Sequence, residues 1–184
     1  TFASSYRDQE HYMLPLSHDE VVHEKRSLLG RMPGGEWQQF SNLKVLLGYQ
    51  WLFTGKPLLF MGGEFGQRTE WDEDEEIDWN SLEPGNLPAG LQQWVSDLNH
   101  LYRDEPALWA GDYSEPGFFW VDCKDHLNSV ACFVRQTPEF DRCVLVVLNL
   151  TPVARESYRI GLPQPGEWQE ILNSDSEFYG GTNQ

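Results

Sequence analysis

The sequence has 184 residues, of which 40% are hydrophobic and 14% aromatic, so the chain can bury a sizeable core and is globular rather than disordered. Its 29 Asp and Glu residues outnumber 13 Lys and Arg residues, and the net charge of −16 excludes nucleic acid and anionic membranes as expected partners, because basic side chains hold both. Since it has neither a run of about 18 apolar residues nor a signal peptide, we expect a soluble, cytoplasmic protein.

The first predicted strand covers residues 12–16 and ends in a cluster of polar side chains. An apolar run of this length is typical of a buried strand. Ser17, His18, Asp19 and Glu20 follow it directly. In parallel α/β folds, functional sites are built at the carboxyl ends of the strands. These residues are therefore the first candidates for a site.

A β-α-β unit is predicted next. Apolar side chains recur at every third or fourth position over residues 37–53, which favours a helix. They are Trp37, Phe40, Leu43, Leu47 and Trp51. A second short apolar run at 57–61 predicts another strand, and a strand, a helix and a strand in this order imply a parallel sheet. After an acidic loop over 66–85, the same spacing predicts a second helix at 88–103.

The pattern changes after about residue 110. Five short β-type runs are separated by turn signals, and they lie at 118–122, 129–135, 143–150, 158–162 and 168–173. Regular spacing without helices is typical of an antiparallel sandwich, so we place a domain boundary near residue 108, between domains 1–108 and 109–184. The three cysteines, Cys123, Cys132 and Cys143, are an odd number without a Cys-x-x-Cys pair, which favours free thiols in a reducing compartment.

Asp19 is the best candidate for a working carboxylate. A carboxylate can stabilise the positive charge that develops in glycosidic bond cleavage, and a neighbouring histidine, His18, can hydrogen-bond to sugar hydroxyls. The structural alternative is an ordinary loop ion pair between Asp19 and Lys25 or Arg26.

Metal binding is the weaker interpretation of the acidic and histidine residues. His18 and His23 are five apart, whereas the zinc-protease helix requires histidines four apart. The acidic run at 72–76 has Ile77 where a calcium loop requires glycine, so a solvated loop is expected. We therefore predict no metal and no cofactor.

Several motifs, in order along nearly the whole chain, carry a resemblance to a known family. They are LPLSHDEVVH at 14–23, RMPG at 31–34, LFMGGEF at 59–65, EW at 70–71, LTPV at 150–153 and WQEILNSD at 168–175. With these motifs the chain closely resembles the bacterial 1,4-α-glucan (glycogen) branching enzymes, which belong to the α-amylase clan of glycoside hydrolases.

The resemblance implies a fold of the α/β plus all-β class. By this likeness residues 1–108 contain the last two βα units of a (β/α)8 TIM barrel, and residues 109–184 form part of a C-terminal antiparallel β-sandwich. Residues 12–16 would be barrel strand seven, residues 57–61 strand eight, and residues 88–103 the last barrel helix.

The resemblance also implies a reaction and residue roles. The family transfers an α-1,4-glucan segment to a 6-hydroxyl of α-1,4-glucan or glycogen, forming α-1,6 branches by retaining double displacement. Asp19 matches the carboxylate that stabilises the transition state, and His18 matches a histidine that contacts the sugar. No part of the sequence matches the nucleophilic aspartate or the acid glutamate, so the resemblance implies a carboxyl-side fragment that is inactive alone.

Two other functions stay open at this point. The chain could be a non-catalytic glucan-binding module, or a hydrolase of the amylase clan such as malto-oligosyltrehalose trehalohydrolase. Two barrel strands alone would also expose both edges of their sheet, which predicts self-association through these edges.

Overall fold

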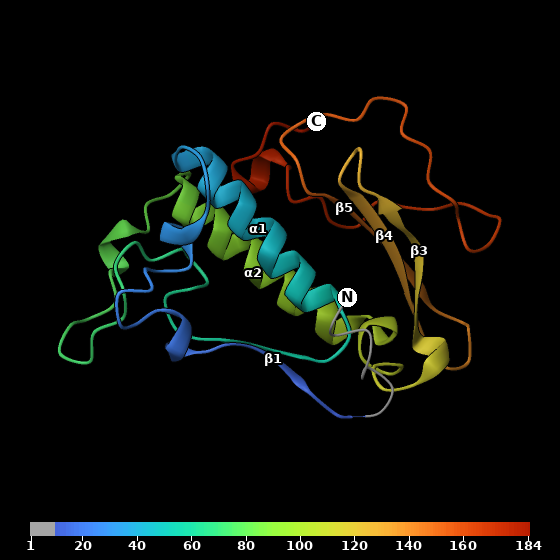
Figure 1. Ribbon diagram of the computed structural model, residues 1–184, viewed down its shortest axis with the longest axis horizontal. Coiled ribbons are helices and arrows are strands. Elements are labelled where there is room, and N and C mark those ends of the chain that lie inside the picture. Colours follow the sequence, from blue (N-terminus) through green and yellow to red (C-terminus); the bar gives the residue numbers. More distant parts are fainter. Residues whose placement is uncertain (1–9) are drawn as a thin grey trace. The chain divides into compact units, whose positions relative to one another are not determined.

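The computed structural model describes residues 10–184 and divides into two compact units (Figure 1). One unit, termed the helical unit, contains residues 13–50, 57–100 and 172–184. The other, termed the sheet unit, contains residues 51–56 and 101–171 together with the described residues up to Tyr12. Each unit thus joins segments that are far apart in the sequence.

Two short strands and the helix between them form the predicted β-α-β unit. Strand β1 (Met13–Leu16) and strand β2 (Lys56–Leu59) pair in a two-stranded sheet, and helix α1 (Glu36–Leu52) connects them. The Lys56 amide donates to the Tyr12 oxygen over 3.2 Å, and the Phe60 amide donates to the Leu16 oxygen over 2.9 Å. Both bonds join residues that are 44 apart, so the strands run parallel.

The prediction that the first strand is buried is wrong. Met13 is 54% exposed, and residues along β1 alternate between exposed and half-buried. A two-stranded sheet covers only part of each strand, and side chains alternate between its faces. Pro15 is compatible with this position, because proline lacks an amide hydrogen and is tolerated in edge strands.

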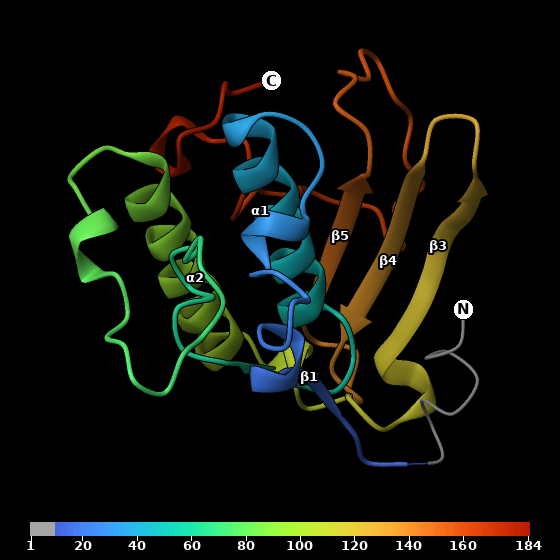
Figure 2. The same ribbon diagram turned by 60° about the vertical axis from the view of Figure 1, so that its left-hand side comes forward.

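Helices α1 and α2 (Leu87–Asp104) lie side by side (Figures 1 and 2). Their buried side chains follow the predicted spacing and are Phe40, Leu43, Leu47 and Trp51 on α1 and Leu91, Trp94 and Leu98 on α2. The Trp94 indole donates to the Lys44 oxygen over 3.0 Å. At the start of α2, the Asn86 side chain accepts from the Ala89 amide, which is an N-cap that satisfies an otherwise unpaired donor.

Trp37 departs from the predicted buried face, since it is 40% exposed. Its indole nitrogen donates to the Gly180 oxygen over 2.9 Å, in a C-terminal segment that packs on the helices. In the same segment the Tyr179 ring lies 5.0 Å from the Trp94 ring, and its hydroxyl donates to Asp97. The Lys44 ammonium donates to the Tyr179 oxygen over 2.9 Å. Residues 172–184 therefore complete the core of the helical unit, which the sequence did not indicate.

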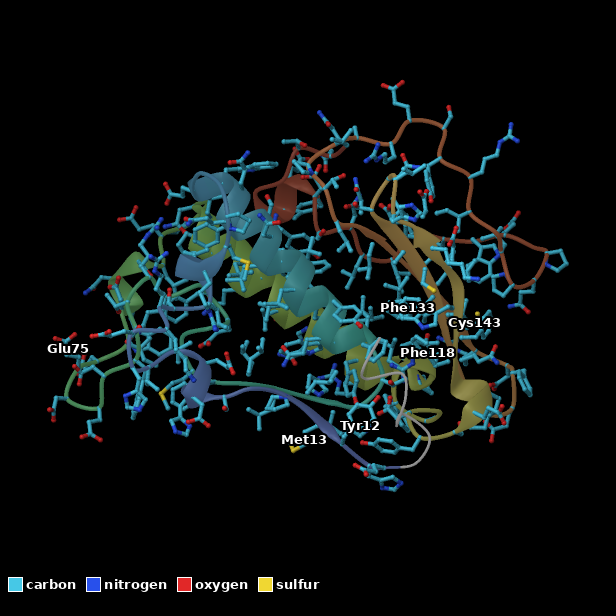
Figure 3. The ribbon with its side chains drawn as sticks, viewed as in Figure 1. Tyr12, Met13, Glu75, Phe118, Phe133 and Cys143 are labelled. Atoms are coloured by element: carbon cyan, nitrogen blue, oxygen red, sulfur yellow. The ribbon has the colours of Figure 1, made fainter. Side chains whose placement is uncertain are left out.

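The sheet unit contains three antiparallel strands in the order β3-β4-β5. They are β3 (Phe118–Asp125), β4 (Val130–Gln136) and β5 (Cys143–Asn149), which confirms three of the five predicted strands. Asp125 closes the β3–β4 turn by accepting from both the amide and the side chain of Asn128. The Phe118 and Phe133 rings lie 5.2 Å apart and form an aromatic core with Phe53 (Figure 3).

The other two predicted strands, at 158–162 and 168–173, are irregular, so the described residues after 108 form one three-stranded sheet and not a sandwich. Pro163 and Pro165 remove backbone donors beside the first of these segments. Side chains anchor the chain here in place of a strand ladder: Arg155 donates to the Asn128 oxygen, and Tyr158 donates to Asp125.

The three cysteines have no disulfide, as predicted; Cys123 is exposed, Cys132 is buried and Cys143 is half-buried. Burial raises the pKa of the Cys132 and Cys143 thiols. Within residues 10–184, neither α1 nor α2 nor any shorter helix has the length and apolar character needed to span a membrane.

Candidate functional site

His18 and Asp19 lie directly after the end of β1, in a short 3-10 helix formed by His18–Glu20. The His18 and Asp19 side chains are 55% and 69% exposed. The Nε2 atom of His18 lies 3.2 Å from the Oδ1 atom of Asp19. The pair therefore presents a carboxylate and an imidazole together to solvent.

Two aromatic side chains border this pair. Phe60 follows the end of β2, and its ring lies 6.0 Å from the His18 ring. Trp71 lies 6.4 Å from His18 and 5.4 Å from Phe60, both in edge-to-face geometry. The carboxyl ends of the two parallel strands thus meet at one edge, as the β-α-β prediction requires. Aromatic rings beside polar groups are suited to a sugar, which has apolar faces and a hydroxyl rim.

The segment that follows Asp19 has an unusual backbone. His23, Glu24 and Arg26 have φ angles of 59°, 64° and 69°, in the left-handed region that glycine favours. Each such residue costs about 1 to 3 kcal/mol, so other contacts must hold the segment in place. We refer to residues 21–27 as the Asp19 loop.

Residues 68–71 supply those contacts. The Glu70 carboxylate accepts from the Glu24 amide over 3.1 Å and from the Arg26 amide over 2.5 Å. The Trp71 amide donates to the Val21 oxygen, and the Ser27 hydroxyl donates to the Arg68 oxygen, both over 2.9 Å. The EW motif at 70–71 does not by itself reveal these backbone contacts.

The structure does not support the alternative of an Asp19 ion pair with Lys25 or Arg26. The Lys25 ammonium donates to the backbone oxygen of Asp19 over 2.6 Å and not to its carboxylate. Of the neighbouring acids, Glu20 pairs with Arg31 at 3.0 Å, and Glu70 accepts from the loop backbone. The Asp19 carboxylate is therefore exposed at this edge, beside the His18 imidazole.

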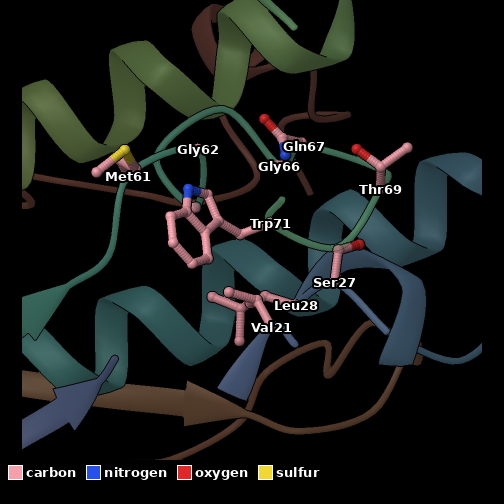
Figure 4. A pocket seen from close by; sticks show the side chains of 10 residues that line it. Val21, Ser27, Leu28, Met61, Gly62, Gly66, Gln67, Thr69 and Trp71 are labelled. Carbon is pink, nitrogen blue, oxygen red and sulfur yellow. The ribbon is translucent and has the colours of Figure 1, made fainter. Parts of the chain in front are cut away.

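A small hollow lies beside the aromatic side chains, with the Trp71 indole at its centre (Figure 4). Val21, Leu28 and Met61 supply apolar walls, and the polar and glycine residues that line it are Ser27, Gly62, Gly63, Gly66, Gln67 and Thr69. Gly66 has a φ of 72°, and a Cβ atom there would lie 3.0 Å from Phe40. The loop after β2 can therefore pack this closely on the helical core only with glycine at 66.

In the part of the chain that the structure describes, no three His, Cys, Asp or Glu side chains are grouped to hold a metal ion. The acidic residues 72–76 are all exposed, as predicted for a solvated loop. Glu75, for example, extends from the rim of the loop (Figure 3).

The C-terminal part of the chain matches a known domain family. The family described as the alpha amylase C-terminal all-beta domain matches residues 120–184, which include most of β3 and all of β4 and β5. The crystal structure of AmyP in complex with maltose superposes with a TM-score of 0.49 at 19% identity, over 66% of this chain and 27% of that chain. The family match thus covers the part of the chain that forms most of the β3-β4-β5 sheet and the residues after it.

Curated relatives are similar over the whole chain. The 1,4-alpha-glucan branching enzyme GlgB of Saccharophagus degradans is 52% identical over 183 residues, and that of Paramagnetospirillum magneticum is 50% identical over 183 residues. Both alignments cover 100% of this chain and 25% of the relative. The chain is similar along its whole length to the C-terminal part of these GlgB enzymes, and it spans about a quarter of their length.

Proposed function

We propose that the chain is the C-terminal part of a 1,4-α-glucan branching enzyme that acts on α-1,4-glucan or glycogen. The observation that carries the proposal is identity of about 50% to GlgB enzymes along the whole chain. The exposed carboxylate and imidazole beside Phe60 and Trp71 support it, since this is a chemically suitable edge for a sugar.

The proposal includes an architecture. β1, α1, β2 and α2 are the last two βα units of a (β/α)8 barrel, and the C-terminal domain begins near residue 108. The parallel pairing of β1 with β2 and the position of His18 and Asp19 after a strand end both fit a barrel, in which active sites lie at the carboxyl ends of strands.

In the proposed mechanism Asp19 stabilises positive charge on the sugar at the transition state, and His18 hydrogen-bonds to the sugar ring. A retaining reaction also needs a nucleophile and an acid, about 5 to 5.5 Å apart. The rest of the enzyme supplies both, so the 184-residue chain alone has no turnover. The interaction with Asp19 strengthens as charge develops, so it lowers the barrier rather than tightening ground-state binding.

The test uses the full-length protein and amylose. The expected product contains new α-1,6 linkages without a matching rise in free reducing ends. Reducing ends without branches would instead identify a hydrolase and reject the branching assignment.

The same assay tests the role of Asp19. We expect Asp19→Asn to leave folding nearly intact and to lower kcat by several orders of magnitude, because the amide lacks the charge that stabilises the transition state. Asp74→Asn, in the exposed acidic loop, is the matched control. Near-normal branching by Asp19→Asn would remove Asp19 from the catalytic residues.

A further inference from the structure

We infer that Glu70 is a positioning residue for Asp19: it fixes the backbone of the Asp19 loop, and Lys25 of that loop in turn holds the backbone of Asp19. The inference rests on the proposed function, because it takes Asp19 as the catalytic carboxylate. Glu70 acts through two successive contacts and does not need to touch the glucan.

The first contact is between Glu70 and the loop backbone. One carboxylate oxygen, Oε2, accepts from the Glu24 amide over 3.1 Å, and the other, Oε1, accepts from the Arg26 amide over 2.5 Å. Both of these residues have left-handed φ angles, which non-glycine residues seldom adopt. Hydrogen bonds to a charged acceptor are stronger than neutral ones. Glu70 therefore stabilises a conformation that the loop would otherwise leave.

The second contact joins the loop to Asp19. Lys25 lies between the two residues that Glu70 holds, and its ammonium donates to the Asp19 backbone oxygen over 2.6 Å. The Asp19 side chain is 69% exposed, so packing alone does not fix it. The position of its carboxylate therefore depends on backbone contacts, and Lys25 supplies one of them.

The ends of the Asp19 loop have attachments of their own. The Val21 oxygen accepts from the Trp71 amide, and the Ser27 hydroxyl donates to the Arg68 oxygen. Neither bond uses the Glu70 side chain. Removing the Glu70 carboxylate should therefore release residues 23–26 and leave the rest of the loop in place. A loss of Asp19 positioning can then be distinguished from a loss of the overall fold.

The test compares Glu70→Ala, Glu70→Gln and Lys25→Met with Asp19→Asn in the full-length enzyme. We expect Glu70→Ala to lower kcat on the order of tenfold to a hundredfold with KM nearly unchanged, as displacement of a catalytic group does. Trypsin should cut faster after Lys25 or Arg26 in this variant, since the released loop can enter a protease. Glu70→Gln keeps one acceptor oxygen, so its kcat should fall less than that of Glu70→Ala. Lys25→Met should lower kcat without faster cleavage after Arg26.

Glu73→Ala is the matched control, because it removes the same charge from the exposed acidic loop. Normal kcat in Glu70→Ala, with Asp19→Asn inactive, would overturn the positioning role and leave the branching function standing. A loss of kcat without faster loop cleavage, or an equal loss in Glu73→Ala, would overturn it too. Activity in Asp19→Asn would reject the proposed role of Asp19 and this inference with it. If Glu70→Ala does not fold, Glu70→Gln and Lys25→Met decide the question.

Discussion

At the scale of single residues, the hydrogen bond between Tyr158 and Asp125 couples an irregular segment to the β3–β4 turn. The Tyr158 hydroxyl donates to the Asp125 carboxylate over 2.7 Å. This bond raises the pKa of Tyr158 to about 12 and lowers the pKa of Asp125, whose carboxylate also accepts from Asn128. The phenol must stay protonated to donate, so the bond makes the sheet unit sensitive to alkaline pH.

The sign of this effect follows from linkage. The Tyr158 pKa in the folded protein lies above the unfolded value of about 10, so its stabilisation is complete below pH ~10 and is lost as the pH rises towards 12. We expect a phenolate absorbance titration to contain a late step that Tyr158→Phe removes and that Asp125→Asn moves towards pH ~10. Burial also raises the pKa of Tyr102 and Tyr179, so late steps from these two phenols remain in Tyr158→Phe. A late absorbance change of undiminished size in Tyr158→Phe would contradict the assignment.

At the scale of elements, Arg135 connects strand β4 to residues 52–53 and to residues 108–112 of the sheet unit. It is fully buried and forms an ion pair with Asp112. Its guanidinium also donates to the backbone oxygens of Leu52, Phe53 and Leu108. Burial lowers the pKa of Arg135, and Asp112 opposes this shift. One side chain thus satisfies two carbonyl groups at the end of α1, where the helix itself leaves such groups unpaired.

We expect Arg135→Met to lower the free energy of unfolding by about 3 to 5 kcal/mol, because Asp112 loses its buried partner and keeps only Lys56, and three carbonyls lose their donor. Chemical denaturation measures this change. Arg103→Met is the control, since Arg103 pairs with Asp104 in solvent and its loss should have little effect. An unchanged denaturation midpoint in Arg135→Met would show that the network does not stabilise the fold.

Local patterns predicted the regular elements well. The three-and-four spacing indicated α1 and α2 to within one or two residues, and the apolar runs indicated β1 and β2. The strands expected at 158–162 and 168–173 do not form, because a short β-type run forms a strand only where a neighbouring strand supplies backbone hydrogen bonds. The role of Arg135 could not be predicted from the sequence. It stands near the end of a predicted strand, and its partners are mostly backbone carbonyls, which every residue has.

The candidate site was predictable only in part. His18 and Asp19 could be chosen because polar residues directly follow a strand, and the resemblance suggested their roles. The contacts of Glu70 with Glu24 and Arg26 join residues 46 and 44 apart through backbone amides. Any residue except proline presents such an amide, so no sequence pattern marks this pairing.

At the scale of the whole molecule, the small β1-β2 sheet determines how the chain should behave in solution. Within the described residues it has two strands, and each strand pairs with one neighbour. Unpaired strand edges are templates for pairing with another chain. Charge opposes this association, since the net charge is −16, and salt screens that repulsion.

We propose that the 184-residue chain self-associates through these edges, and that association increases with salt. Sedimentation velocity over a range of concentrations and salt measures it directly. A charge placed on the edge, as in Met13→Lys, should weaken association, whereas Phe140→Lys, an exposed site outside both strands, should not. Sharp, dispersed amide signals from a sample that stays monomeric would contradict the proposal.

The packing of residues 172–184 on α1 and α2 has a consequence for the order of folding. Lys44 and Tyr179 are 135 residues apart in the sequence. Trp94, whose ring contacts that of Tyr179, is also far from it along the chain. At ~5–20 residues per second, the ribosome needs roughly 4 to 17 s to travel from Trp94 to Tyr179. During that interval the nascent helices keep an apolar face that nothing from residues 172–184 can cover. The core of the helical unit can therefore be completed only after synthesis has passed residue 179.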